Sequence, residues 1–126
     1  MRKKKTPSGL GFKVAFRGIG YAFWSQRNMR IHGVVACVVI ALGLWVKLPP
    51  IEWMICFGTI TMVFVAEMVN TSIEILVDLV TKKQKYRAML SKDVAAGAVL
   101  LASIGAAIVG YLLFFQRVCT LLGWRN

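Results

Sequence analysis

Acidic residues are scarce in this sequence. Five Asp and Glu stand against sixteen Lys and Arg, which gives a formal net charge of +11. Such a basic excess suits nucleic acid, anionic lipid headgroups or phosphorylated ligands, and composition alone does not choose among them. A Walker loop, Gly-x-x-x-x-Gly-Lys-Ser/Thr, is also absent, and nothing else Gly-rich could cradle phosphates, which excludes a P-loop enzyme.

Paired cysteines are missing as well. Cys37, Cys56 and Cys119 have no CxxC spacing and lie in or beside apolar runs, so we interpret them as small buried apolar side chains. The basic residues flank these runs and, apart from Tyr86, lack interleaved aromatic side chains that stack on bases. Nucleic-acid binding is therefore disfavoured.

Long apolar blocks are what the chain does have. It is 58% hydrophobic over 126 residues, with a mean hydropathy of +0.67, more than a soluble single domain can bury. The sequence therefore predicts one all-α integral membrane domain. Basic residues gather before the first block and between the last two, which predicts a multi-pass membrane protein with a cytoplasmic N-terminus.

The apolar blocks divide this domain into predicted segments. They are a basic tail over 1–9, a surface helix over 10–25, membrane helices over 31–48, 51–80 and 92–115, and a second tail over 116–126. Pro49 and Pro50 separate the first two spans. The 51–80 helix would be about 45 Å long, more than the hydrocarbon is thick, so its end should protrude into the cytoplasm.

The segment before the first span is predicted to lie in the membrane interface. Phe12, Phe16, Ile19 and Phe23 recur at the spacing of one helix face, while Lys13, Arg17 and Gly20 recur on another. His32 and the four tryptophans are interpreted as interfacial anchors or packing residues rather than catalytic groups.

Three of the five acids lie on the 51–80 helix. At 100° per residue Glu67, Asn70, Glu74 and Asp78 share one narrow stripe. Carboxylates near hydrocarbon are costly unless a cation or proton offsets them, and no Lys or Arg lies within this span. Ion pairing with neighbouring helices is the alternative role, and it suits Asp78, near the surface, best.

Magnesium bridging nucleotide phosphates would match this stripe, because the metal takes carboxylates while Lys and Arg take the other phosphate oxygens. Glu67 should lie near the inner edge of the hydrocarbon, with Glu74 about 10 Å further toward the cytosol. A carboxylate at the first depth suits proton abstraction from a lipid hydroxyl, and ATP can reach the second. The pattern predicts phosphoryl transfer.

Four ordered stretches carry a resemblance to a known family. They are 27–32 (RNMRIH), 51–53 (IEW), 67–74 (EMVNTSIE) followed by Val77-Asp78, and 92–99 (KDVAAGAV). Over about residues 12–115 the chain resembles the bacterial DgkA family of small integral-membrane lipid kinases, and within it the Gram-positive branch, the undecaprenol kinases.

That resemblance implies a location in the bacterial inner (plasma) membrane, a homotrimer with active sites shared between subunits, and magnesium-ATP as phosphoryl donor. Glu67 would be the catalytic proton acceptor and Glu74 a magnesium ligand that also contacts ATP. Nucleotide binding would further involve Asn70, Asp78, Lys83, Lys85, Lys92 and Asp93. The lipid substrate would meet Glu67, Asn28, Met29, Arg30, Phe16 and Phe23.

One position departs from the family pattern. A second metal-binding glutamate is usual two residues before Asn28, and here Gln26 stands there. A glutamine oxygen can coordinate magnesium but brings no charge, so we expect weaker metal affinity or a different local arrangement.

Other functions remain open from the sequence. The same chemistry could act on diacylglycerol, and loss of activity through Gln26 would leave a non-catalytic lipid-binding protein. A channel or transporter lined by the acids is disfavoured because the chain shows no repeats or broken helices.

Overall fold

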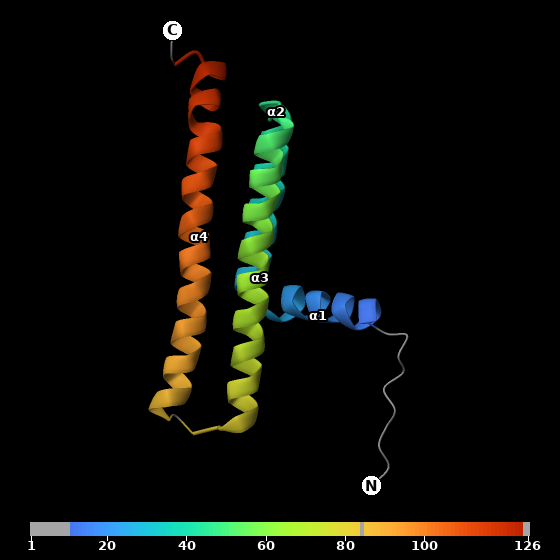
Figure 1. Ribbon diagram of the computed structural model, residues 1–126, viewed down its shortest axis with the longest axis vertical. Helices are drawn as coiled ribbons and strands as arrows, with labels where there is room; N and C mark the ends of the chain where they lie inside the picture. Colours follow the sequence, from blue (N-terminus) through green and yellow to red (C-terminus); the bar gives the residue numbers. More distant parts are fainter. Residues whose placement is uncertain (1–10, 84, 125–126) are drawn as a thin grey trace.

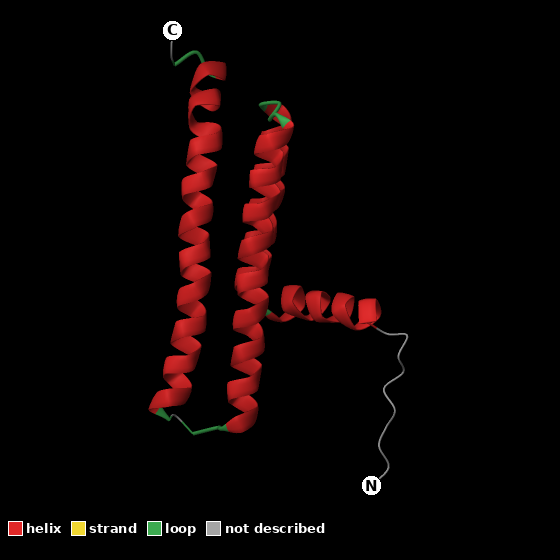
Figure 2. Cartoon of the chain, in the orientation of Figure 1, coloured by secondary structure: helices red, strands yellow, loops and turns green. Residues whose placement is uncertain are grey.

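The computed structural model describes residues 11–83 and 85–124, and these residues form helices joined by short turns, with no strand among them (Figures 1 and 2). The helices are α1 (Gly11–Ser25), α2 (Arg27–Trp45), α3 (Pro50–Val80) and α4 (Tyr86–Leu121). The all-helical prediction is confirmed. The predicted tail 1–9, the first residue of the predicted surface helix and the last two residues lie outside the described part of the chain.

Three of these helices, α2, α3 and α4, are long and apolar enough to cross a membrane, as the apolar blocks predicted. They run alongside one another, while α1 projects crosswise from them (Figure 1). Large apolar side chains such as Met54 on α3 and Leu101 on α4 point outward and are about seven-tenths exposed. Water would penalise such a surface, whereas hydrocarbon does not.

The corner between α1 and α2 consists of one residue. Gln26 has an extended backbone (φ −104°, ψ 121°), and α2 begins directly after it, at Arg27 rather than at the predicted 31. No helix breaker lies between Arg27 and Ile31, and polar side chains near a membrane surface do not stop a helix, so the hydropathy boundary came too late.

The turn between α2 and α3 forms where the two prolines predicted it. Helix α2 ends at Trp45 rather than 48, Lys47 takes a left-handed conformation (φ 54°), and Pro50 opens α3. Glu52 occupies the first turn of α3, where the helix dipole favours an anion.

Helix α4 is longer than predicted at both ends, since it begins at Tyr86 rather than 92 and ends at Leu121 rather than 115. The added turns contain good helix formers and no proline or glycine. Polar residues end the apolar run that was used to predict the span, but they do not end the helix. Residues 116–121 are therefore helical, which corrects the predicted tail. The expectation of three buried cysteines is also corrected: only Cys56 is buried, Cys119 is partly exposed, and Cys37 faces outward on α2.

Side chains from three helices meet where α1 joins the bundle. The Phe23 ring lies 5.6 Å from the Phe64 ring between centroids, and a Cβ at Gly33 would come within 3.0 Å of Phe23. Packing against Gly33 thus lets α1 approach α2 closely. Helices α3 and α4 continue past the level of α1 (Figure 1), so if α1 lies in the interface, their connected ends extend beyond it.

Candidate active site

Glu74 is the centre of a polar cluster at the level where α1 meets α3. Gln26 Nε2 donates a hydrogen bond to Glu74 Oε2 at 3.1 Å, and Asn70 Nδ2 donates to Glu74 Oε1 at 3.1 Å. Asn70 is buried, and its Oδ1 has no hydrogen-bond partner among the described residues. The cluster therefore contains one carboxylate, two amides and an unused acceptor oxygen.

Glu67 lies two turns further into the bundle and is 2% exposed. Its Oε1 is 3.3 Å from Nε2 of His32, a contact that is not aligned as a hydrogen bond, and Oε1 accepts none from the described residues. No Lys or Arg lies within the α3 span, and the sequence predicts His32 to be an anchoring or packing residue, yet His32 is the ionisable partner of Glu67. Helix α2 supplies that partner, and only the folded pairing of α2 with α3 reveals it.

Asp78 forms the ion pair that was the alternative role for it. Its carboxylate meets Lys92 Nζ on α4 at 2.5 Å, and the Asp78 side chain is 65% exposed. Asp93, the next residue on α4, is exposed and forms no ion pair with any described residue. The acidic stripe of α3 thus runs from the buried Glu67 through the half-buried Glu74 to the exposed Asp78.

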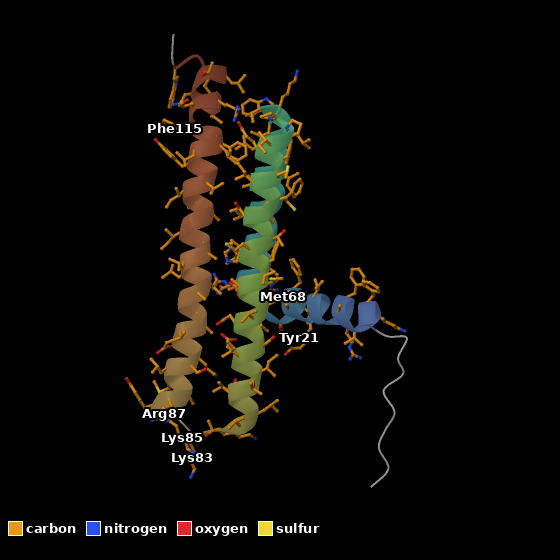
Figure 3. The ribbon with its side chains drawn as sticks, viewed as in Figure 1. Tyr21, Met68, Lys83, Lys85, Arg87 and Phe115 are labelled. Atoms are coloured by element: carbon orange, nitrogen blue, oxygen red, sulfur yellow. The ribbon has the colours of Figure 1, made fainter. Side chains whose placement is uncertain are left out.

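Cations surround the connection between α3 and α4. Lys83, Lys85 and Arg87 gather at the end of the bundle where these helices join (Figure 3), and all three are exposed. Lys83 and Lys85 are held at this turn by a backbone hydrogen bond of 2.8 Å from Lys85 N to Lys83 O. The site therefore has positive charge on the side of Asp78 and hydrocarbon-facing residues on the side of Glu67.

An apolar groove of about 360 Å³ lies among α2, α3 and α4 on the other side of Glu67. Val63, one turn from Glu67, and His32 line it, and small side chains of α4, including Ala106 and Gly110, form the opposite wall. Clefts of this volume are typical of sites for apolar ligands. The groove extends among the spans to His32, the residue that contacts Glu67.

The residues predicted to meet the lipid occupy different environments. Phe23 packs on Phe64, which lines the groove, and Phe16 is 70% exposed on α1. Asn28 and Arg30 are exposed at the start of α2, whereas Met29 is 1% exposed within the core. Of these five positions, Phe23 alone touches a residue that lines the groove in the contacts described.

The donors around Glu74 suit a magnesium ion that also binds nucleotide phosphates. Such an ion usually takes one or two carboxylates and leaves its other positions to phosphate oxygens and water. Glu74 supplies one carboxylate, and Asn70 Oδ1 is a buried acceptor with no partner among the described residues. The Gln26 amide could turn so that its oxygen faces an ion bound at Glu74. No group of three His, Cys, Asp or Glu side chains occurs among residues 11–83 and 85–124, so an all-protein metal cage is not present there.

A known protein family and several known proteins match most of this chain. The prokaryotic diacylglycerol kinase family matches residues 13–114. An undecaprenol kinase of Bacillus subtilis is 41% identical over 107 residues, which are 85% of this chain and 87% of that protein. A diacylglycerol kinase of Synechocystis sp. is 40% identical over 115 residues, or 90% of this chain and 65% of that protein, and the Escherichia coli diacylglycerol kinase is 24% identical over 103 residues, or 82% and 84%.

The match covers α2 and α3 entirely and most of α1 and α4, and it includes each acid of the α3 stripe. Membership of a kinase family implies ATP as the phosphoryl donor. The chain belongs to the prokaryotic diacylglycerol kinase family and is a multi-pass membrane lipid kinase, a phosphotransferase.

Proposed function

We propose that this kinase phosphorylates undecaprenol, a long polyprenol, to undecaprenyl phosphate. The observation that carries the proposal is the buried carboxylate of Glu67, which contacts His32, a residue that lines an apolar groove. A groove between spans suits the chain of a membrane alcohol, and a carboxylate in contact with a residue of its lining suits the hydroxyl. The similarity to the undecaprenol kinase extends over 87% of that protein, against 65% for the Synechocystis diacylglycerol kinase.

In the proposed reaction the lipid hydroxyl gives its proton to the Glu67 carboxylate while its oxygen bonds to the γ-phosphorus of ATP. The bond from that phosphorus to the bridging oxygen breaks, and ADP leaves. Phosphoryl transfer depends mainly on positioning and on stabilising charge on the phosphoryl oxygens, so the protein needs no covalent intermediate. The general base supplies roughly 10²- to 10⁴-fold in rate.

Glu74, Asn70 and Gln26 would hold magnesium in this proposal. Bound there, magnesium would offset the negative charge of the ATP phosphates. Lys92, Lys83 and Lys85 would contact the remaining phosphate oxygens from the cationic end of the bundle. Asp78 would keep Lys92 in place, and Asp93 would hold another part of the nucleotide.

The proposed assembly is a homotrimer in which neighbouring subunits share each active site. Two features support it: the exposed Asp93, which is unpaired within the described chain, and the single carboxylate that one subunit brings to the metal. The cationic turn at Lys83 and Lys85 supports a cytoplasmic position for the nucleotide end, because basic segments remain on that side of bacterial membranes.

A panel of purified lipids tests the substrate. The protein in detergent micelles receives labelled ATP with undecaprenol, a shorter polyprenol or diacylglycerol at equal mole fraction, and labelled lipid is counted. We expect the highest kcat/KM with undecaprenol. A higher kcat/KM with diacylglycerol would replace the proposed substrate, and the name of the Synechocystis relative makes that the second candidate.

Two substitutions test whether catalysis occurs where we place it. Glu67→Gln and Glu74→Gln should each lower kcat at least roughly 100-fold, because one removes the base and the other the metal carboxylate. Glu52→Gln, at the opposite end of α3, is the matched control and should keep its turnover. Unchanged lipid phosphate formation in both site variants would refute the placement and favour a non-catalytic role for the acidic stripe.

A further inference from the structure

His32 is the only histidine in the chain, and it contacts the buried carboxylate of Glu67. The two side chains come from different helices, and Nε2 of His32 lies 3.3 Å from Oε1 of Glu67. That Oε1 atom is buried and accepts no hydrogen bond within the described residues. His32 is thus the polar side chain that α2 brings to the proposed base.

A buried carboxylate with no partner is strongly unfavourable, since its water has been removed and not replaced. Thr71 does not meet that need, because its hydroxyl donates to the Glu67 backbone carbonyl. The other described polar groups of α3 that make side-chain contacts at this level, Asn70 and Glu74, bind one another. Of the described groups, therefore, only the His32 imidazole is within reach of the Glu67 carboxylate.

His32 also lines the apolar groove, with a side chain that is 23% exposed. The same side chain thus borders the groove and contacts Glu67. A lipid hydroxyl that arrives through the groove would reach His32, whose Nε2 lies 3.3 Å from Oε1 of Glu67. A contact that is loose in the free enzyme can align when the substrate closes the site.

We propose that His32 is a positioning residue: its Nε2–H group holds the Glu67 carboxylate in the orientation needed to take the proton of the lipid hydroxyl. This inference deepens the proposed function and rests on it, because Glu67 must be the base. His32 would therefore be neither a membrane anchor nor a residue that only fills space. The hydrogen on Nε2 is the feature that matters.

The contact can be observed without any activity measurement. In the full-length protein labelled with ¹⁵N-histidine in micelles, the imidazole signals come from His32 alone, since the chain has no second histidine. We expect Glu67→Gln to shift the Nε2 signal. Glu52→Gln, which alters a carboxylate paired with Arg117 elsewhere on α3, should leave it in place.

Two replacements of His32 then separate donation from packing. His32→Gln keeps an N–H donor near Nε2, whereas His32→Phe keeps the ring and removes the donor. We expect His32→Phe to lower kcat about tenfold or more with KM for ATP within about twofold, and His32→Gln to retain most of kcat. In a Glu67→Gln background, His32→Phe should cause no further loss, because the partner it positions is already gone.

Different results would contradict the positioning role of His32 and the proposed lipid kinase function. An Nε2 signal that does not respond to Glu67→Gln would overturn the contact, and equal or better turnover of His32→Phe relative to His32→Gln would overturn the positioning role. Only the turnover comparison requires an active unmodified kinase. Lack of lipid phosphorylation by the unmodified protein, or full activity of Glu67→Gln, would instead overturn the proposed function and this inference with it.

Discussion

Gln26 and Glu74 are joined by a hydrogen bond of 3.1 Å from Gln26 Nε2 to Glu74 Oε2. The corner between α1 and α2 is thereby tied to the polar face of α3. Since Asn70 occupies the other carboxylate oxygen, both oxygens of Glu74 accept hydrogen bonds from amides. A magnesium ion at Glu74 would compete with these two donors, and the Gln26 amide would have to turn to offer its oxygen.

Replacing this amide with a carboxylate should strengthen metal binding. In Gln26→Glu, two negative groups would face the ion, so we expect the magnesium concentration for half-maximal activity to fall roughly tenfold, equivalent to about 1.4 kcal/mol. Activity of the purified protein is measured over a magnesium titration at saturating ATP. The metal-free variant should unfold at a lower temperature than the unmodified protein, since the two carboxylates repel each other.

Gln26→Ala is the matched variant for this titration. It removes both the hydrogen bond and the amide oxygen, so half-maximal activity should require more magnesium than in the unmodified protein. The same metal dependence in all three proteins would show that position 26 is outside the metal site.

The ion pair of Asp78 with Lys92 can be separated from a nucleotide role by comparing two substitutions. If Lys92 contacts a phosphate, Lys92→Ala should raise KM for ATP roughly tenfold or more, the effect of losing a charge-assisted hydrogen bond. Asp78→Asn leaves the ammonium group in place and should raise KM for ATP much less. Steady-state kinetics over an ATP series gives both values.

Lys92→Ala and Asp78→Asn could instead raise KM for ATP by the same factor. Equal increases would indicate that the ion pair itself holds α4 against α3, with no direct contact between Lys92 and the nucleotide. Thermal unfolding of both variants supplies the check, because a purely structural pair would lower both unfolding temperatures together.

The helices and the acidic stripe could be predicted because both depend on local pattern. Long apolar runs fix the spans, and the helical period places Glu67 and Glu74 on one side of α3 wherever the helix packs. The ends of α4 could not be found in this way. Hydropathy falls at Lys92 and again after Phe115, whereas the backbone continues as a helix until its hydrogen bonding stops, at Tyr86 and Leu121.

Contacts between helices were the part that the sequence did not disclose. The meeting of His32 with Glu67 requires the depth and rotation of α2 against α3, and neither is encoded in the spacing of residues along one helix. A signal was nonetheless present: His32 is the sole histidine and follows the polar stretch 27–30 at the start of a span. An ionisable side chain at that depth calls for a partner, and Glu67 is the acid at matching depth.

Gly43 is the position where an added methyl group should disturb packing most clearly. A Cβ there would lie 2.8 Å from Cη2 of Trp53 and 3.1 Å from Cδ1 of Leu48. The Trp53 ring is stacked on Phe57 at 5.3 Å between centroids, so it cannot move away freely. We expect Gly43→Ala to lower the free energy of unfolding by about 1–3 kcal/mol, as measured by denaturation in micelles.

Gly20→Ala provides the comparison, since nothing lies within 4 Å of a Cβ at that position on α1. Its effect should reflect helix propensity alone, a stabilisation of up to about 1 kcal/mol. Equal stability of the two variants would mean that the turn between α2 and α3 adjusts without cost.

Glu52 and Arg117 connect α3 and α4 at the end of the bundle opposite the proposed site. Arg117 donates from Nη2 to Glu52 Oε1 at 2.9 Å and from Nη1 to Glu52 Oε2, and Nη1 also donates to the Leu113 carbonyl. Two parallel hydrogen bonds to one carboxylate are stronger and more directional than a single contact. Glu52→Gln should therefore lower the unfolding temperature by several degrees while leaving kcat unchanged.

Arg117→Gln in the same protein makes this prediction specific to the pair. If the two side chains stabilise the bundle through each other, the double variant Glu52→Gln/Arg117→Gln should lose less stability than the two single losses combined, because an unpaired partner is no longer left behind. Strict additivity would mean that each residue acts through separate contacts, such as that of Arg117 with Leu113. If these variants instead lowered kcat without changing the unfolding temperature, this end of α3 would be coupled to Glu67. A pair that only holds α4 against α3 would not have that effect.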